Sequence, residues 1–140
     1  MRYKITVEYE GTHLVGWQKQ KDGASAQEFL EKAILGFSHQ AAEVFGAGRT
    51  DAGVHALAQV AHFDLNLDLS EYKIMESLNA LLRELQAPVS VLQAEKVSDD
   101  FHARFSAVGR GYIYRILNRR GPSPLLVDRV WRVPYPLDID

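Results

Sequence analysis

The order of the apolar patterns along the chain is the feature that most restricts its fold. Apolar and polar residues alternate over residues 3–10, which predicts a half-buried strand. Ser25 begins a capping box, and the apolar residues that follow it recur at helical spacing. Residues 43–45 and 57–65 then form two short strand patterns. The first part of the chain therefore predicts a strand, a helix and two strands, in that order.

A second helix and a further strand follow. Ser70 caps an amphipathic helical pattern that Pro88 stops, and residues 89–97 have the composition of a strand. The complete order is typical of a ferredoxin-like split β-α-β layer. We therefore predict an α+β fold with a mostly antiparallel sheet and two helices on one face.

The last third of the chain is less regular. Residues 111–117 alternate in a strand pattern that puts Tyr112 on one face, and residues 118–124 form a turn-rich basic loop. Residues 129–133 predict a last short strand. Residues 134–140, with two prolines, are typical of the start of a linker.

Composition excludes several classes of chemistry. The 140 residues are 46% hydrophobic, enough for one domain with its own core. The absence of cysteine rules out disulfides, thiolate metal sites and cysteine nucleophiles. No stretch has the apolar length of a membrane span or the pattern of a signal peptide, so we expect a cytoplasmic protein without membrane contact.

Charge is distributed unevenly although the whole chain carries only −2. Residues 1–100 have nine Lys or Arg against fifteen Asp or Glu, whereas residues 101–140 have seven Arg against three Asp. Arginine without lysine suits bidentate contact with phosphates and stacking on bases. The alternative is a solvated strand face with no ligand.

A glycine-rich segment, Gly46 to Ala56, contains the residues best suited to chemistry. Arg49 and Asp51 lie two positions apart in it, so in an extended backbone their side chains would point to the same side. A carboxylate beside a permanent cation stays ionised, which suits a nucleophile or an electrostatic stabiliser. A surface turn with a local ion pair is the alternative. A phosphate cradle is disfavoured because no Walker lysine is present and the Asp51 carboxylate would repel phosphate.

Other candidate residues leave alternatives open. Tyr112 could stack on a base or pack in the core, and Trp17 favours packing. The histidines lack ligand spacing, so we expect no metal site. No serine lies in a nucleophile elbow, which argues against a hydrolase triad.

Three separated motifs together resemble the tRNA pseudouridine synthase A family. They are the Gly46 to Ala56 loop, the segment Tyr9-Glu10-Gly11-Thr12 with Gly16-Trp17-Gln18-Lys19-Gln20, and Asp100-Phe101-His102-Ala103-Arg104-Phe105-Ser106-Ala107 with Arg110 and Tyr112. The resemblance implies that Asp51 is the catalytic aspartate and that Tyr112 lies against the target base. It also implies that Arg49 holds Asp51 and the flipped-out nucleotide, and that Arg110 contacts the substrate.

The resemblance also implies an activity and a substrate. The family isomerises uridine to pseudouridine in the anticodon stem-loop of tRNA, without metal or organic cofactor and usually as a homodimer. A carboxylate that attacks C1′, or assists its departure, is compatible with this chemistry. The target uridine must leave its stack, at a cost of about a few kcal/mol that stacking and arginine contacts could offset.

Length is the main departure from the family, whose members are about twice as long. We expect residues 1–140 to form a single N-terminal domain, with residues 134–140 beginning an interdomain linker and the second domain absent. A truncated, catalytically silent RNA-binding module is therefore the leading alternative to the enzyme. A small carboxylate-dependent hydrolase is a third possibility, although the sequence has no second acid at a readable spacing.

Overall fold

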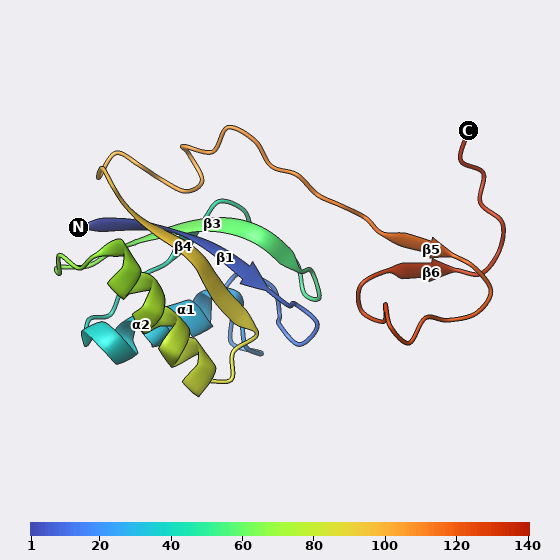
Figure 1. Ribbon diagram of the computed structural model, residues 1–140. Coiled ribbons are helices and arrows are strands. Elements are labelled where there is room, and N and C mark those ends of the chain that lie inside the picture. Colours follow the sequence, from blue (N-terminus) through green and yellow to red (C-terminus); the bar gives the residue numbers. More distant parts are fainter. The chain divides into compact units, whose positions relative to one another are not determined.

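The computed structural model describes all 140 residues and divides them into two units, Met1–Val108 and Gly109–Asp140. The first unit contains β1 (Arg2–Tyr9), α1 (Ala26–Ser38), β2 (Phe45–Gly46), β3 (Ala56–Asp64), α2 (Glu71–Glu84) and β4 (Val89–Val97). The second contains β5 (Ile116–Asn118) and β6 (Trp131–Val133). Figure 1 labels these elements.

The four strands of the first unit form one sheet in the order β2-β3-β1-β4, and every neighbouring pair is antiparallel. Each helix connects two strands that have one other strand between them. Both helices cover the same face of the sheet (Figure 1). The predicted α+β architecture, with a mostly antiparallel sheet and two helices on one face, is confirmed.

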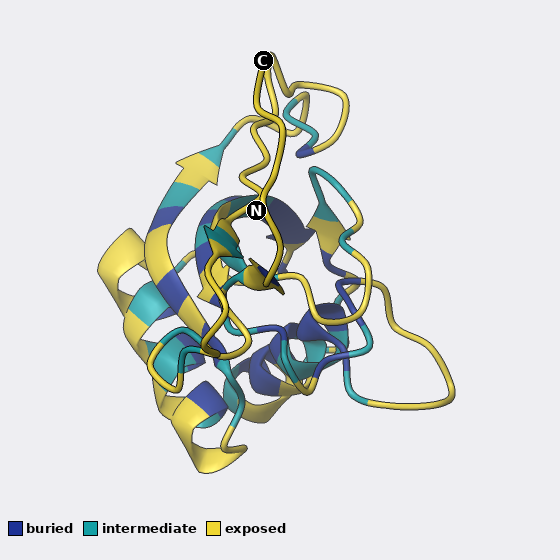
Figure 2. Cartoon of the chain, turned by 90° about the vertical axis from the view of Figure 1, so that its right-hand side faces the viewer, coloured by how far each residue is buried: buried dark blue, intermediate teal, exposed yellow.

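The core lies between this sheet and the two helices. The apolar side of β1 is at most 2% exposed, as its period-two alternation predicts. The helices contribute the opposing side chains, and Figure 2 shows the resulting dark-blue interior. Each fully buried large aliphatic side chain stabilises the fold by roughly 1.5–3 kcal/mol relative to an exposed one. The main members of this core are Tyr3, Ile5, Val7, Tyr9, Leu30, Ile34, Phe63, Ile74, Leu78 and Leu82.

Both helices begin at the predicted caps. The Ser25 hydroxyl accepts the Glu28 N–H at 3.1 Å, and the Ser70 hydroxyl accepts the Lys73 N–H at 3.1 Å. Each cap satisfies one of the backbone donors that a helix N-terminus leaves without a partner in the helix. Neither helix combines the length and the apolar composition needed to cross a bilayer.

In the second unit, β5 and β6 pair in parallel, with Ile116 opposite Trp131. The predicted strand over residues 111–117 was wrong for residues 111–115, because the observed strand begins only at Ile116. The Arg115 carbonyl accepts the Trp131 N–H at 2.8 Å, but residues 111–114 have no strand beside them to supply a ladder of backbone hydrogen bonds. The last strand is also shorter than predicted, since it begins at Trp131 and not at residue 129.

Candidate active site

The loop that carries Asp51 joins β2 to β3, as the strand patterns predicted. Its first part is tied to β3 by two hydrogen bonds. The Ala47 N–H donates to the Val60 carbonyl at 2.8 Å, and the Gln59 side-chain amide donates to the Gly48 carbonyl at 2.7 Å. The sheet therefore supports the loop directly.

A second segment, residues 9–17, holds the loop on both sides of Asp51. The Trp17 N–H donates to the Thr50 carbonyl at 3.1 Å, and the Gly53 N–H donates to the Leu14 carbonyl at 3.4 Å. Within the loop, the Val54 N–H donates to the Asp51 carbonyl at 3.2 Å and closes a turn. The backbone at Asp51 is thus fixed by contacts that come from another part of the sequence.

Two glycines allow these segments to approach each other. Gly16 has a φ of 109°, and a Cβ at this position would collide with the Thr50 carbonyl oxygen. A Cβ on Gly46 would lie 2.6 Å from Cε2 of the Trp17 indole. Trp17 is only 2% exposed, so the prediction that it packs is confirmed. Its ring fills the space beneath the start of the Asp51 loop.

The Asp51 and Arg49 side chains are both exposed. They form no ion pair with each other, so the expected pairing of this carboxylate with its neighbouring guanidinium was wrong. The expectation assumed an extended backbone throughout the segment, whereas the chain bends at residues 47–48, just before Arg49, and turns at residues 52–53, just after Asp51. Asp51 is left as a carboxylate presented to solvent from a fixed backbone.

Tyr112 and Arg110 belong to the second unit, Gly109–Asp140. The Tyr112 side chain is 66% exposed, which excludes the core-packing alternative for this ring within its own unit. Arg110 is exposed as well. An accessible ring and a guanidinium two positions away are suited to contact a base and a phosphate.

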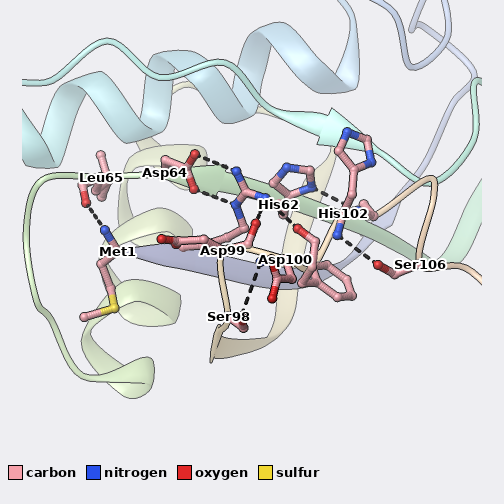
Figure 3. Close-up of polar contacts among 12 residues, drawn as sticks. Met1, His62, Asp64, Leu65, Ser98, Asp99, Asp100, His102 and Ser106 are labelled. Carbon is pink, nitrogen blue, oxygen red and sulfur yellow. Dashed lines mark hydrogen bonds and ion pairs between the residues drawn. The ribbon is translucent and has the colours of Figure 1, made fainter.

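A polar connector, residues 98–106, lies against the sheet face opposite the helices. Arg2 holds one end of it by donating to the Asp99 carbonyl at 2.8 Å and to the Phe101 carbonyl at 2.6 Å. The same guanidinium is fixed by a bidentate pair with Asp64 at 2.8 and 2.9 Å, as Figure 3 shows. This pair lowers the pKa of Asp64, chiefly through the hydrogen bond from Arg2.

His62 on β3 holds the other end of the connector. Its Nδ1 accepts the Ala103 N–H at 3.0 Å (Figure 3). His62 is only 1% exposed. Burial, together with electrostatic interactions with Arg2 and His102, lowers the pKa of His62 to about 4. The imidazole is therefore neutral at physiological pH and keeps the lone pair that this hydrogen bond requires.

Sequence reasoning missed the roles of His62 and Tyr9. The alternation of residues 57–65 places His62 on the face opposite the apolar residues, but this signal indicates only a polar face. Tyr9 has the pattern of a core residue, and nothing near it in sequence indicates that its hydroxyl reaches Thr50. Both roles depend on contacts between segments about forty residues apart.

Comparison with known proteins decides the family. A family model described as tRNA pseudouridine synthase matches residues 5–106, a range that runs from β1 through the Asp51 loop to the connector. The chain belongs to the tRNA pseudouridine synthase family. It is 51% identical to the tRNA pseudouridine synthase A of Ehrlichia chaffeensis over 141 aligned residues, which cover 100% of this chain and 57% of that protein.

Other relatives give the same result. The tRNA pseudouridine synthase A of Rhodospirillum centenum is 52% identical over 99% of this chain and 56% of its own length. The protein of the same name from Parvibaculum lavamentivorans is 50% identical over the same shares. The chain thus spans little more than half the length of the curated relatives it matches.

Proposed function

We propose that the protein containing this chain isomerises uridine to pseudouridine in tRNA, with Asp51 as the catalytic aspartate. Membership of the family supports the reaction, and the tRNA named in its relatives supports the substrate. The observation that carries the assignment of Asp51 is its setting: an exposed carboxylate on a loop whose backbone is held from β3 and from residues 9–17. A nucleophile needs this combination of access and fixed position.

The proposed chemistry uses an oxygen of the Asp51 carboxylate as the nucleophile toward the ribose C1′. The N1–C1′ bond breaks and its electron pair leaves with the uracil ring, which rotates in the site. C5 then bonds to C1′ and displaces the carboxylate, while C5 loses its proton and N1 gains one. The carboxylate is regenerated at the end, so no metal or organic cofactor is required.

The remaining candidate residues contact the substrate in this proposal. Tyr112 stacks against the everted uracil, and Arg49 and Arg110 bind the phosphates of the flipped nucleotide. Stacking on an aromatic ring contributes roughly 1–3 kcal/mol per base, comparable to the cost of everting a uridine. The exposed positions of all three side chains support these roles.

We further propose that the tRNA region contacted is the anticodon stem-loop and that the complete enzyme acts as a homodimer in the cytoplasm. In this proposal residues 1–140 form its N-terminal domain, and residues 134–140 begin a linker to a second domain. The greater length of the curated relatives supports a further domain. The seven arginines after residue 100 support contact with a folded polyanion.

Tritium release tests the proposed function. A transcript of tRNA labelled with tritium at C5 of uridine loses the label to water when C5 bonds to C1′. We expect the protein expressed from its complete reading frame to release tritium, and Asp51→Asn to abolish release without weakening tRNA binding. The matched control is Asp22→Asn, which removes an exposed carboxylate from a neighbouring loop and should leave release unchanged. Release at the wild-type rate by the Asp51 variant refutes its role.

The leading alternative is an RNA-binding module without catalysis, which the limited length of the chain favours for these residues on their own. It predicts that the 140-residue chain binds tRNA in a salt-dependent manner without turnover. Alanine in place of Arg104, Arg110 or Arg115 should then weaken binding and reduce its salt dependence. Unchanged binding by all three variants contradicts this alternative.

A further inference from the structure

A hydroxyl of the core reaches the residue next to Asp51. Tyr9 lies at the end of β1, where its ring is 2% exposed and packs 6.2 Å from the centroid of the Trp17 ring. Its hydroxyl oxygen lies 2.7 Å from the Thr50 hydroxyl oxygen, in a hydrogen bond that either group can donate. Packing does not account for this oxygen, because phenylalanine would fill the same volume in the core.

From this contact we propose that the Tyr9 hydroxyl is a positioning group for Asp51, an inference that rests on the proposed function. Thr50 immediately precedes Asp51, and it is held at two separate atoms. Tyr9 holds its side-chain oxygen, while the Trp17 N–H holds its carbonyl at 3.1 Å. Because threonine has few χ1 rotamers, a fixed Oγ1 also fixes the Thr50 backbone and the start of the next residue.

The other side of Asp51 is held by residues 11–14. The Gly53 N–H reaches the Leu14 carbonyl at 3.4 Å, near the upper limit of a useful hydrogen bond. The Gly11 N–H donates to Nδ1 of His55 at 2.8 Å, and Gly11 lies so close to the Val54 carbonyl that a Cβ would collide with it. On the side that precedes Asp51, the placement of its backbone therefore depends on Thr50, and through it on Tyr9.

Misplacement of a reacting group by about 1 Å can lower a rate by about 10²-fold. Tyr9→Phe removes one oxygen and leaves the ring in place. We expect this variant to lower the single-turnover rate of tritium release at least about tenfold, while the Kd for tRNA stays unchanged. An effect on the rate without an effect on binding separates positioning from substrate contact.

Tyr3→Phe is the matched structural control. Tyr3 lies on the same strand and the same face, is 0% exposed, and hydrogen bonds through its hydroxyl to the Leu67 carbonyl at 2.8 Å. Its hydroxyl contacts the segment before α2 and has no contact with the Asp51 loop. Because the Tyr3 hydroxyl also accepts the Leu69 N–H at 2.8 Å, we expect Tyr3→Phe to lower the free energy of unfolding at least as much as Tyr9→Phe and to leave the rate of release unchanged.

Variants of Thr50 complete the test. Thr50→Ser keeps the hydroxyl and should retain a rate close to that of the wild type, whereas Thr50→Val should lower it as Tyr9→Phe does. The double variant Tyr9→Phe/Thr50→Val should be no slower than either single variant, because both remove the same hydrogen bond. A wild-type rate for Tyr9→Phe, or single effects that multiply in the double variant, overturns the inference.

The same experiments separate this inference from the proposed function. If Asp51→Asn abolishes release and Tyr9→Phe does not slow it, only the positioning role fails. If the wild-type protein releases no tritium, the proposed function fails, and amide hydrogen exchange then decides the positioning role. We expect the Trp17 and Gly53 amides to exchange at least about tenfold faster in Tyr9→Phe than in Tyr3→Phe, and equal rates overturn it.

Discussion

The neutral state of His62 makes the stability of the fold depend on pH. The pKa of His62 falls from an ordinary value of 6.5 to about 4 in the folded chain, mainly because the imidazole is buried. The unfolded chain therefore binds a proton between pH 6.5 and pH 4 that the folded chain does not bind. The contribution of the neutral His62 to the free energy of unfolding is fully present above pH 6.5 and decreases as the pH falls toward 4.

The size of this effect follows from the shift. A pKa difference between 6.5 and about 4 corresponds to a loss of about 3 kcal/mol once the pH is below both values. Between pH 7.5 and pH 5, His62 alone should lower the free energy of unfolding by about 2 kcal/mol. Four ionisable or charged groups face His62: Arg2 and Lys4 on β1, Asp64 on β3, and His102 in the connector.

Urea unfolding at the two pH values measures the effect. Trp131 is replaced by Phe so that fluorescence reports on the buried Trp17. The comparison variant is His62→Asn, whose side-chain oxygen can accept the Ala103 N–H in place of Nδ1 but does not titrate. The variant loses ring packing at every pH, so only the difference in pH dependence is diagnostic. Equal losses of stability in the two proteins between pH 7.5 and pH 5 would refute the assignment.

Three further predictions concern stability and are checked by the same urea unfolding at pH 7.5. Gly46→Ala should cost about 1–3 kcal/mol, because the new Cβ would lie 2.6 Å from the buried Trp17 ring, and a wild-type midpoint would contradict this contact. Ser25→Ala should cost about 1 kcal/mol through loss of the α1 cap, whereas Ser25→Gly should cost only a few tenths. Arg2→Gln removes a charge that lowers the pKa of His62. When the urea unfolding is repeated at pH 5, the free energy of unfolding of this variant should therefore have decreased less from its value at pH 7.5 than that of the wild type.

The architecture of the first unit was predictable because its signals are local and agree with one another. Strand β1 alternates with a period of two, and both helices carry an apolar stripe after a serine cap. The position of the Asp51 loop between two strands followed from the same patterns. In each case the side chains that carry the signal also make the core contact or the cap.

The failed predictions share a different cause. The alternation of residues 111–117 was the same kind of signal as that of β1, but a strand also needs a neighbour, and no strand lies beside residues 111–114. The Arg49–Asp51 pair was inferred from spacing in an extended chain, whereas the loop bends just before Arg49 and turns just after Asp51. The sequence pattern predicts which face of a strand a residue occupies, but it does not identify the segment with which the backbone will pair.

Within the first unit, the structure shows what the motifs that carry the family resemblance contact and how they are held. The early motif, which includes Tyr9 and Trp17, holds the Asp51 loop through a hydroxyl contact, a backbone hydrogen bond and a buried ring. The later motif, with His102 and Ala103, is fastened by His62 and Arg2 to the sheet face opposite the helices. β3 connects the two arrangements, because it begins just after the Asp51 loop and carries His62 near its end. We therefore expect substitutions in these motifs to change the placement of Asp51 or of the connector more than they change the sheet.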